Sequence, residues 1–178
     1  MKFKVDDITA EAKETTFPAP AAPINEALSG SGGGEFRIEA PVTVAASYYR
    51  AGTEVFFDGE LIATMHATCA RCAEEFSTPT ARPFHFILAP RVLFDDAVGA
   101  ADADTAGYAH YDGDVIDLGP LIREEMLLGL PTRALCREDC RGLCPRCGAN
   151  LNEGACRCTQ PPGDSRLAVL RTLKIQRS

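Results

Sequence analysis

The sequence contains no long apolar run, and this absence excludes a large class of proteins. No stretch approaches the roughly 18 consecutive apolar residues that a membrane-spanning helix needs, so we expect no membrane association. The segment from Met1 to Asp7 also lacks the apolar core of a secretory signal. Hydrophobic residues make up 46% and charged residues 24% of the chain, which is the balance of a soluble globular protein. We therefore expect a cytoplasmic protein.

Motifs for common enzyme chemistry are also missing. The histidines are His66, His85 and His110, and none is spaced with a serine or cysteine in a way that suggests a catalytic triad. Residues 29–34 are rich in glycine but lack the Gly-Lys-Ser/Thr ending of a phosphate loop. No motif for hydride transfer or hydrolysis is present either. We expect no catalysis and no small-molecule substrate.

Charge is distributed unevenly along the 178 residues. Residues 1–132 contain 9 Lys and Arg against 21 Asp and Glu, a balance of −12, whereas residues 133–178 contain 9 against 4, a balance of +5. An acidic body followed by an arginine-rich tail is typical of a protein that contacts RNA or a basic partner. An excess of solvated surface charge would give the same totals, so charge alone leaves both interpretations open.

The chain divides into three segments by composition. Residues 1–34 are interpreted as a polar lead-in with one strand at Phe3–Val5, followed by a proline-rich and then a glycine-rich linker. Residues 35–132 are predicted to form a β-rich body with an acidic loop and one helix. Residues 133–178 contain six of the 8 cysteines and are predicted to form a zinc module that ends in a short helix over residues 164–174.

Alternating apolar residues predict the strands of the body. The pattern of period two occurs in residues 36–44, 53–57 and 61–65, and a further apolar strand follows Pro83 at residues 84–88. The dipeptide Asp58-Gly59, which favours a two-residue turn, predicts a hairpin at that point. The prediction is an α+β fold, with an antiparallel β meander or a partly open barrel.

Two further segments complete the body. Residues 95–114 are acidic and poor in apolar residues, which predicts a mobile loop. A helix is predicted to start at Asp117, with Pro120 in its first turn, and to end at Gly129 and Pro131. Its apolar residues recur at helical spacing, so one face should pack on the core.

The strongest chemical signal is a pair of cysteine motifs near the C-terminus. Cys144 and Cys147 enclose Pro145-Arg146 and precede Gly148, which is the form of a zinc knuckle. Cys156 and Cys158 supply a second pair after eight residues. Four thiolates in two close pairs meet the tetrahedral preference of zinc, so we expect zinc bound by Cys144, Cys147, Cys156 and Cys158.

The other four cysteines are interpreted as a second zinc site. These are Cys69, Cys72, Cys136 and Cys140. Although 63 residues separate the two pairs, such a site would fasten the strands to the C-terminal module. If the strand at residues 61–65 continues, Cys69 shares its apolar face, whereas His66 lies on the opposite face and is not expected to be a ligand.

Three alternatives to this assignment stay open. Cys140 lies close enough to Cys144 to replace Cys156 or Cys158 in a single site. The pair Cys69 and Cys72 could be a redox centre, although Glu74 and Glu75 would raise the thiol pKa there. Four thiolates also bind iron. The alternative function is therefore a thiol redox or iron-binding electron-transfer protein.

Four arginines lie close together between Cys136 and Cys158, which we call the cysteine-rich segment, and they predict a binding face. They are Arg137, Arg141, Arg146 and Arg157. Guanidinium groups suit bidentate contact with phosphate or carboxylate.

Several segments together resemble the YceD family. They are Cys69-Ala70-Arg71-Cys72 with Phe76, Asp117-Leu118 with Leu121-Ile122-Arg123-Glu124-Glu125, residues 140–152, Cys156 with Cys158, and residues 165–170. The terminal motif of the family has a proline where this chain has Ser165. The resemblance implies a non-enzymatic role in ribosome biogenesis, namely accumulation of large-subunit ribosomal RNA, with ribosomal RNA or a large-subunit ribosomal protein as partner.

Overall fold

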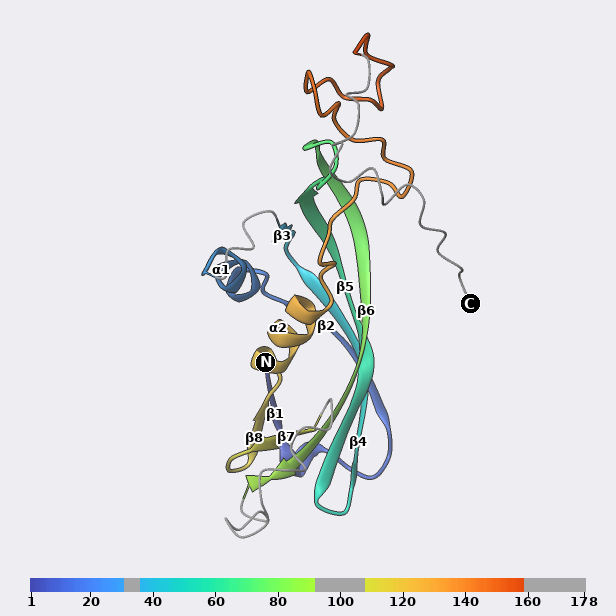
Figure 1. Cartoon of the computed structure of the whole chain (residues 1–178). Coiled ribbons are helices and arrows are strands. Elements are labelled where there is room, and N and C mark those ends of the chain that lie inside the picture. The colour runs from blue at the N-terminus through green and yellow to red at the C-terminus, as the bar shows by residue number, and fades with distance from the viewer. Residues whose placement is uncertain (31–35, 92–107, 159–178) are drawn as a thin grey trace, which may run out of the picture.

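The structure, a computed structural model, describes residues 1–30, 36–91 and 108–158. Its elements in chain order are β1 (Lys2–Lys4), a short 3-10 turn η1 (Val5–Asp7), β2 (Lys13–Ala19), α1 (Ala22–Gly30), β3 (Phe36–Ile38), β4 (Val42–Ala51), β5 (Glu54–Thr68), β6 (Glu75–Pro90), β7 (Tyr108–Tyr111), β8 (Val115–Asp117) and α2 (Gly119–Leu128) (Figure 1). Neither helix is long and apolar enough to cross a membrane, within the ranges just given.

The strands form two open sheets. The larger has the order β2-β4-β5-β6-β7, with β3 beside β5, and the smaller consists of β1 and β8. Pairing is antiparallel except between β6 and β7, which run parallel. The predicted α+β class is therefore confirmed. The meander is formed by β4, β5 and β6, and the sheets do not close into a barrel.

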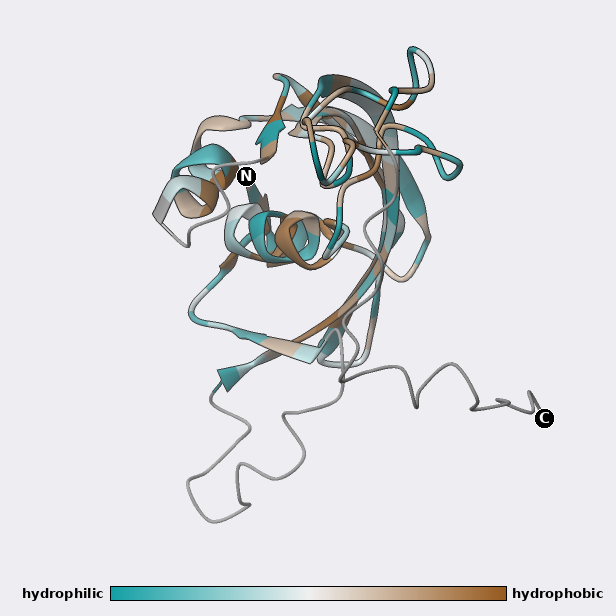
Figure 2. Ribbon diagram, turned by 45° about the horizontal axis from the view of Figure 1, so that its top comes forward, coloured by the Kyte–Doolittle hydropathy of each residue, from teal (hydrophilic) through white to brown (hydrophobic). Residues whose placement is uncertain are grey.

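Both helices cover the same face of the larger sheet (Figures 1 and 2). Alternate residues of β5 point to that face and are buried, among them Phe57 and Leu61. Ile122 of α2 and Ile24 of α1 join the same core. Full burial of each such side chain contributes about 1.5–3 kcal/mol. The opposite face of the sheet carries the exposed and half-exposed positions.

The hairpin predicted at Asp58-Gly59 is wrong, because β5 runs straight through it. The turn lies earlier, at Gly52-Thr53, where Gly52 has a φ of +64°. Gly59 instead permits close packing. A Cβ atom there would lie 2.2 Å from the carbonyl oxygen of Ala45 and 2.8 Å from the ring of Phe84. The glycine is thus explained by a close approach of neighbours and not by a turn.

The N-terminal segment also differs from the prediction of a lead-in and linker. It contributes β2, which pairs with β4 along its whole length, and α1. Phe17 and Leu28 are buried in the core. The prolines that suggested a linker fit these elements. Pro18 lies in an edge strand, where its missing N–H costs little, and Pro23 lies in the first turn of α1.

The predictions for the helix, the acidic loop and the terminal segment have different outcomes. The helix α2 has the predicted place, and Pro120 lies in its first turn. Residues 108–111 of the segment interpreted as a mobile loop form β7 instead. Residues 95–107 of that segment, residues 31–34 of the glycine-rich linker and the terminal helix over residues 164–174 lie outside the described residues.

Candidate metal centres

The long strands β5 and β6 carry the cysteine-rich segment at their shared end (Figure 1). Cys69 and Cys72 lie in the loop between these two strands, and Cys136 and Cys140 lie in the segment that follows α2. The backbone of Ala70 donates a hydrogen bond to the carbonyl of Ala134 at 2.8 Å, which holds the two segments together. The alternation along β5 turns Cys69 inward as expected, and it is buried.

The first cluster consists of these four cysteines. Their sulfur atoms all lie within 4.8 Å of one another. The Sγ atoms of Cys69 and Cys140 are 3.8 Å apart, and those of Cys72 and Cys136 are 3.7 Å apart. A tetrahedral site with metal–sulfur bonds of about 2.3 Å has its sulfurs about 3.8 Å apart. The four thiols therefore have the spacing of a metal site, and they could hold a metal ion.

The second cluster consists of Cys144, Cys147, Cys156 and Cys158, whose sulfurs also lie within 4.8 Å of one another. It is the more accessible of the two, because Cys147 is exposed and Cys144 alone is buried. All eight cysteines are free thiols. The structure thus groups the cysteines into the same two sets as the sequence did, with Cys140 in the first set.

The loops that begin at Cys69 and Cys144 have the same geometry. The N–H of each cysteine donates to the carbonyl five residues later, Glu74 or Ala149, at 2.8 Å. The carbonyl of each accepts from the N–H four residues later, that of Ala73 or Gly148, at 2.9 Å. These last two residues have φ values of +58° and +72°. Both loops therefore have the backbone shape of a knuckle that could hold a metal ion. Ala73 occupies the left-handed position in the first loop, where a glycine would be less strained.

Hydrogen bonds to sulfur lower the pKa of Cys69 and Cys140 in the first cluster and of Cys144 in the second. The backbone N–H groups of Cys147 and Arg146 lower the pKa of Cys144 to about 6. Burial by itself would raise the pKa of Cys69, but backbone hydrogen bonds from Cys136 and Arg71 outweigh it and lower the pKa to about 6. Backbone donors of this kind stabilise a thiolate before any cation arrives.

One thiol in each cluster has a strongly raised pKa and therefore ionises last. These thiols are Cys136 and Cys158. Burial, together with hydrogen bonding to Cys69, raises the pKa of Cys136 to about 12. A hydrogen bond with Cys147 and burial raise the pKa of Cys158 to about 12. Adjacent thiolates repel one another, and a cation among them removes that repulsion. Metal binding would therefore release protons from both clusters.

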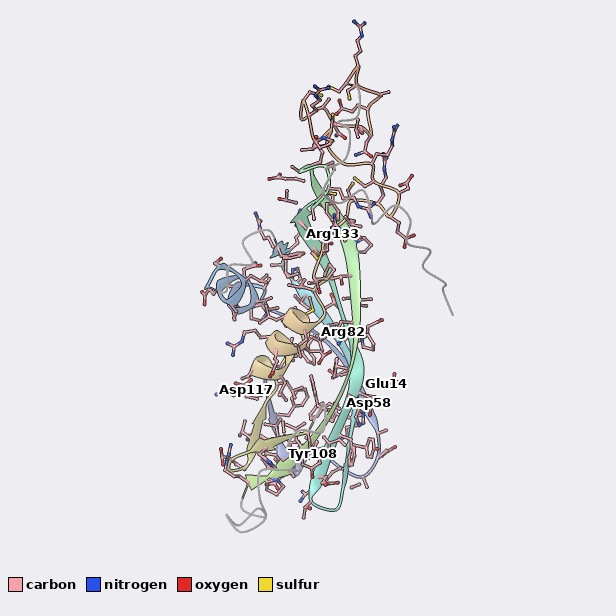
Figure 3. The ribbon with its side chains drawn as sticks, viewed as in Figure 1. Glu14, Asp58, Arg82, Tyr108, Asp117 and Arg133 are labelled. Atoms are coloured by element: carbon pink, nitrogen blue, oxygen red, sulfur yellow. The ribbon has the colours of Figure 1, made fainter. Side chains whose placement is uncertain are left out.

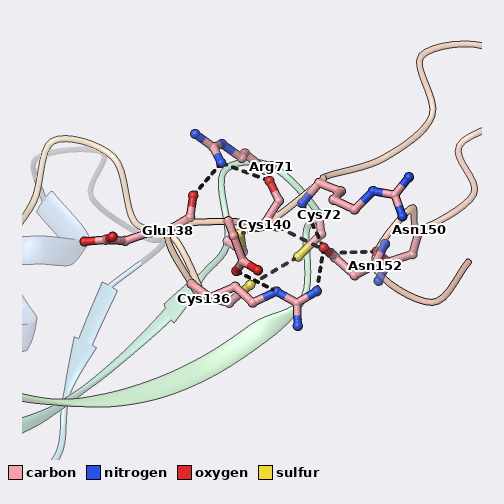
Figure 4. A network of polar contacts seen from close by, with 11 residues as sticks. Arg71, Cys72, Cys136, Glu138, Cys140, Asn150 and Asn152 are labelled. Atoms are coloured by element: carbon pink, nitrogen blue, oxygen red, sulfur yellow. Dashed lines mark hydrogen bonds and ion pairs between the residues drawn. The ribbon is translucent and has the colours of Figure 1, made fainter.

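Asn152 lies between Cys147 and Cys156 of the second cluster and contacts the first cluster (Figure 4). Its side-chain N–H group donates to the sulfur of Cys140 at 3.4 Å. Its side-chain oxygen accepts from the backbone of Arg141 and from the guanidinium of Arg137, both at 2.8 Å. Sequence reasoning gave Asn152 no role, although Asn150 and Asn152 both belong to the motif that resembles YceD. The alternating asparagines, which favour local turns, were the available signal.

Arg71 makes a second connection between the segments. Its guanidinium donates to the carbonyls of Glu138 and Cys140, at 2.9 Å each (Figure 4). Its own carbonyl accepts from the N–H of Leu143 at 3.0 Å. A Cβ atom on Gly142 would lie 2.8 Å from that carbonyl oxygen, so the close contact requires glycine there. Contacts of this kind orient metal ligands.

The arginines predicted as a binding face are all exposed. Arg137 already has partners within the cysteine-rich segment. Its guanidinium donates to Asn152 and lies 3.3 Å from a carboxylate oxygen of Asp139. The histidines lie outside both clusters. His66 instead contacts Ser77 at 2.9 Å and Glu39 at 3.4 Å, in agreement with its predicted place on the opposite face.

The fold and the clusters define a class of protein: an open-sheet α+β protein whose cysteine-rich segment is joined to the sheet through one of two potential metal sites. The chain belongs to the YceD family, because the model of "large ribosomal RNA subunit accumulation protein YceD" matches residues 57–174. The matched region contains all eight cysteines. The resemblance to the YceD family, which the sequence motifs predicted, is therefore confirmed.

A curated relative points to the same family. The chain is 27% identical over 158 residues to the chloroplastic "large ribosomal RNA subunit accumulation protein YCED homolog 1" of Arabidopsis thaliana. The match covers 76% of this chain and 49% of the relative, so the chain spans about half the length of that protein. No solved structure matches the chain.

Proposed function

We propose that this protein is an accessory factor for large ribosomal subunit biogenesis, which promotes accumulation of large-subunit ribosomal RNA by binding and not by catalysis. The observation that carries this proposal is the family match, which spans both cysteine clusters. Clustered thiols that can hold a metal are typical of a reducing compartment, so we propose a cytoplasmic location. RNA or a large-subunit ribosomal protein is the proposed partner.

Zinc is the proposed metal in both clusters. All-thiolate sites with knuckle loops are typical of structural zinc, which contributes directly to folding. Its role would be to hold the cysteine-rich segment rigidly at the end of β5 and β6. Iron is the alternative, and it would favour an electron-transfer function. Purified protein with iron absorbs visible light, whereas protein with zinc is colourless.

Three arginines are proposed as the RNA contact. Arg141, Arg146 and Arg157 are exposed on the cysteine-rich segment, whereas the body of the chain is acidic and repels phosphate. Replacing these three with glutamine should weaken binding to a large-subunit RNA transcript. The slope of log affinity against log salt concentration should fall in magnitude by about 2, because roughly 0.7 counterions are released for each phosphate contact with single-stranded RNA. Filter binding over a salt series measures both quantities.

A matched variant controls for net charge. Lys2, Lys4 and Arg123 are exposed residues of the body, and their replacement by glutamine removes the same charge. The salt slope should stay unchanged in this control. Both variants should keep their metal, which is measured on the same samples. Equal loss of binding in the two variants would contradict a specific RNA contact on the cysteine-rich segment.

A further inference from the structure

One face of the larger sheet is covered by α1 and α2, and no described helix covers the other (Figure 2). The uncovered face is strongly acidic. Its outward-pointing acids are Glu14 on β2, Glu54, Asp58 and Glu60 on β5, and Glu75 on β6. Arg37 is the one Lys or Arg at an outward position among the described residues of this sheet. We call this surface the acidic sheet face.

The central carboxylates of this face lie in one row across the sheet and in the next row along β5. Glu14 pairs in register with Ser47, which pairs in turn with Asp58. Figure 3 shows Glu14 and Asp58 together on the side of the sheet away from the helices. Glu60 follows two residues after Asp58 on the same strand, so it points to the same side. The Asp58 side chain is 50% exposed even though it contacts His85, so it remains accessible to a partner.

Apolar and hollowed surface adjoins these acids. The rings of Tyr49 and Phe56 stack with centroids 5.0 Å apart in the row next to Asp58, and Ile62 is 43% exposed in the row beyond Glu60. A groove of about 510 Å³ lies at the end of the face towards the metal centres, beside Glu75, and its lining also includes Arg37 and His66. Carboxylates beside half-buried aromatic rings suit arginine, which pairs with the carboxylates and stacks on the accessible part of the rings.

We propose that the acidic sheet face binds an extended arginine-rich segment of a partner protein. In an extended chain every second side chain points the same way, about 6.8 Å apart, which is also the spacing of successive outward rows along β5. The charge of the face repels RNA and favours a basic protein. The inference rests on the proposed function, because it assigns a protein partner to that function. The surface is different from that of the arginines proposed to contact RNA.

Binding of a designed peptide to the metal-loaded full chain tests this proposal. The probe is a synthetic peptide in which arginine and valine alternate, and the reference peptide has the same composition with all arginines in one block. The alternating peptide should bind more tightly than the block peptide. The triple variant Glu14→Gln, Asp58→Asn and Glu60→Gln should bind the alternating peptide about tenfold more weakly, as expected for loss of three exposed ion pairs.

Control variants separate the face from net charge. Glu11, Glu26 and Glu124 are exposed acids elsewhere, and their replacement by glutamine should change peptide binding less than about twofold. Equal losses in the two triple variants, or equal binding of the two peptides, would overturn the proposal. So would tighter peptide binding after Arg166, Arg171 and Lys174 are replaced by glutamine, because the chain's own tail would then be the occupant. RNA binding by the acid variants should not fall, so failure here leaves the proposed function standing.

Discussion

Replacing Cys147 with serine should remove one metal ion per chain and unfold the loop from Cys144 to Cys158. This segment has little apolar core of its own, and structural zinc contributes on the order of 10–16 kcal/mol in small finger peptides. Loss of one of four thiolates should therefore free the whole loop. Metal analysis of the purified variant, followed by limited proteolysis with mapping of the cut sites, measures both effects.

The matched control for this variant is Ala155→Ser. Ala155 is exposed in the same loop, and its replacement adds the same hydroxyl without removing a ligand. This control should keep its full metal content and its resistance to protease. A Cys147→Ser protein with unchanged metal content would show that the second cluster is not a metal site.

Replacing Cys69 with serine should have a wider effect. The residue is 2% exposed, and its cluster joins the end of β5 to a segment more than sixty residues later in the chain. We expect metal content to fall from about two ions per chain to about one, the ion in the second cluster being retained. Protease should then cut between α2 and Cys144, because the segment from Cys136 to Cys140 is released from the sheet.

Ala70→Ser serves as the control for this second prediction. Ala70 is exposed in the same loop, and the added hydroxyl leaves the four sulfurs in place. The contrast with Cys147→Ser is also informative, because each variant should lose a different metal ion and expose a different segment. About one ion per chain in the wild-type protein, unaffected by Cys69→Ser, would leave Cys69 and Cys72 as ordinary thiols at a strand end.

The close cysteine pairs were predictable from sequence because they depend on local rules, whereas the place of Cys140 stayed open and is decided by contacts between distant segments. Strand alternation from Leu61 to Cys69 fixes which way Cys69 points, and short spacings fix each pair. Asn152 was missed because its partner Cys140 belongs to the other cluster, and no local pattern encodes a contact between two loops.

Local rules failed where neighbours in space decide the structure. Asp58-Gly59 has the composition of a turn, yet the ring of Phe84 and the carbonyl of Ala45 explain the glycine. The prolines near Phe17 suggested a linker, whereas β4 pairs with that segment and draws it into the sheet. Turn and linker propensities are weak compared with the burial of a strand that completes a core.

The central claim is that this chain promotes accumulation of large-subunit ribosomal RNA. The most direct test is the ratio of mature large-subunit to small-subunit ribosomal RNA in cells that lack the protein, under fast and slow growth. We expect a lowered ratio, restored by the wild-type chain and by the control variant of Lys2, Lys4 and Arg123, but not by the variant of Arg141, Arg146 and Arg157. A normal ratio in the deletion cells under both conditions would contradict the proposed function and favour the redox alternative.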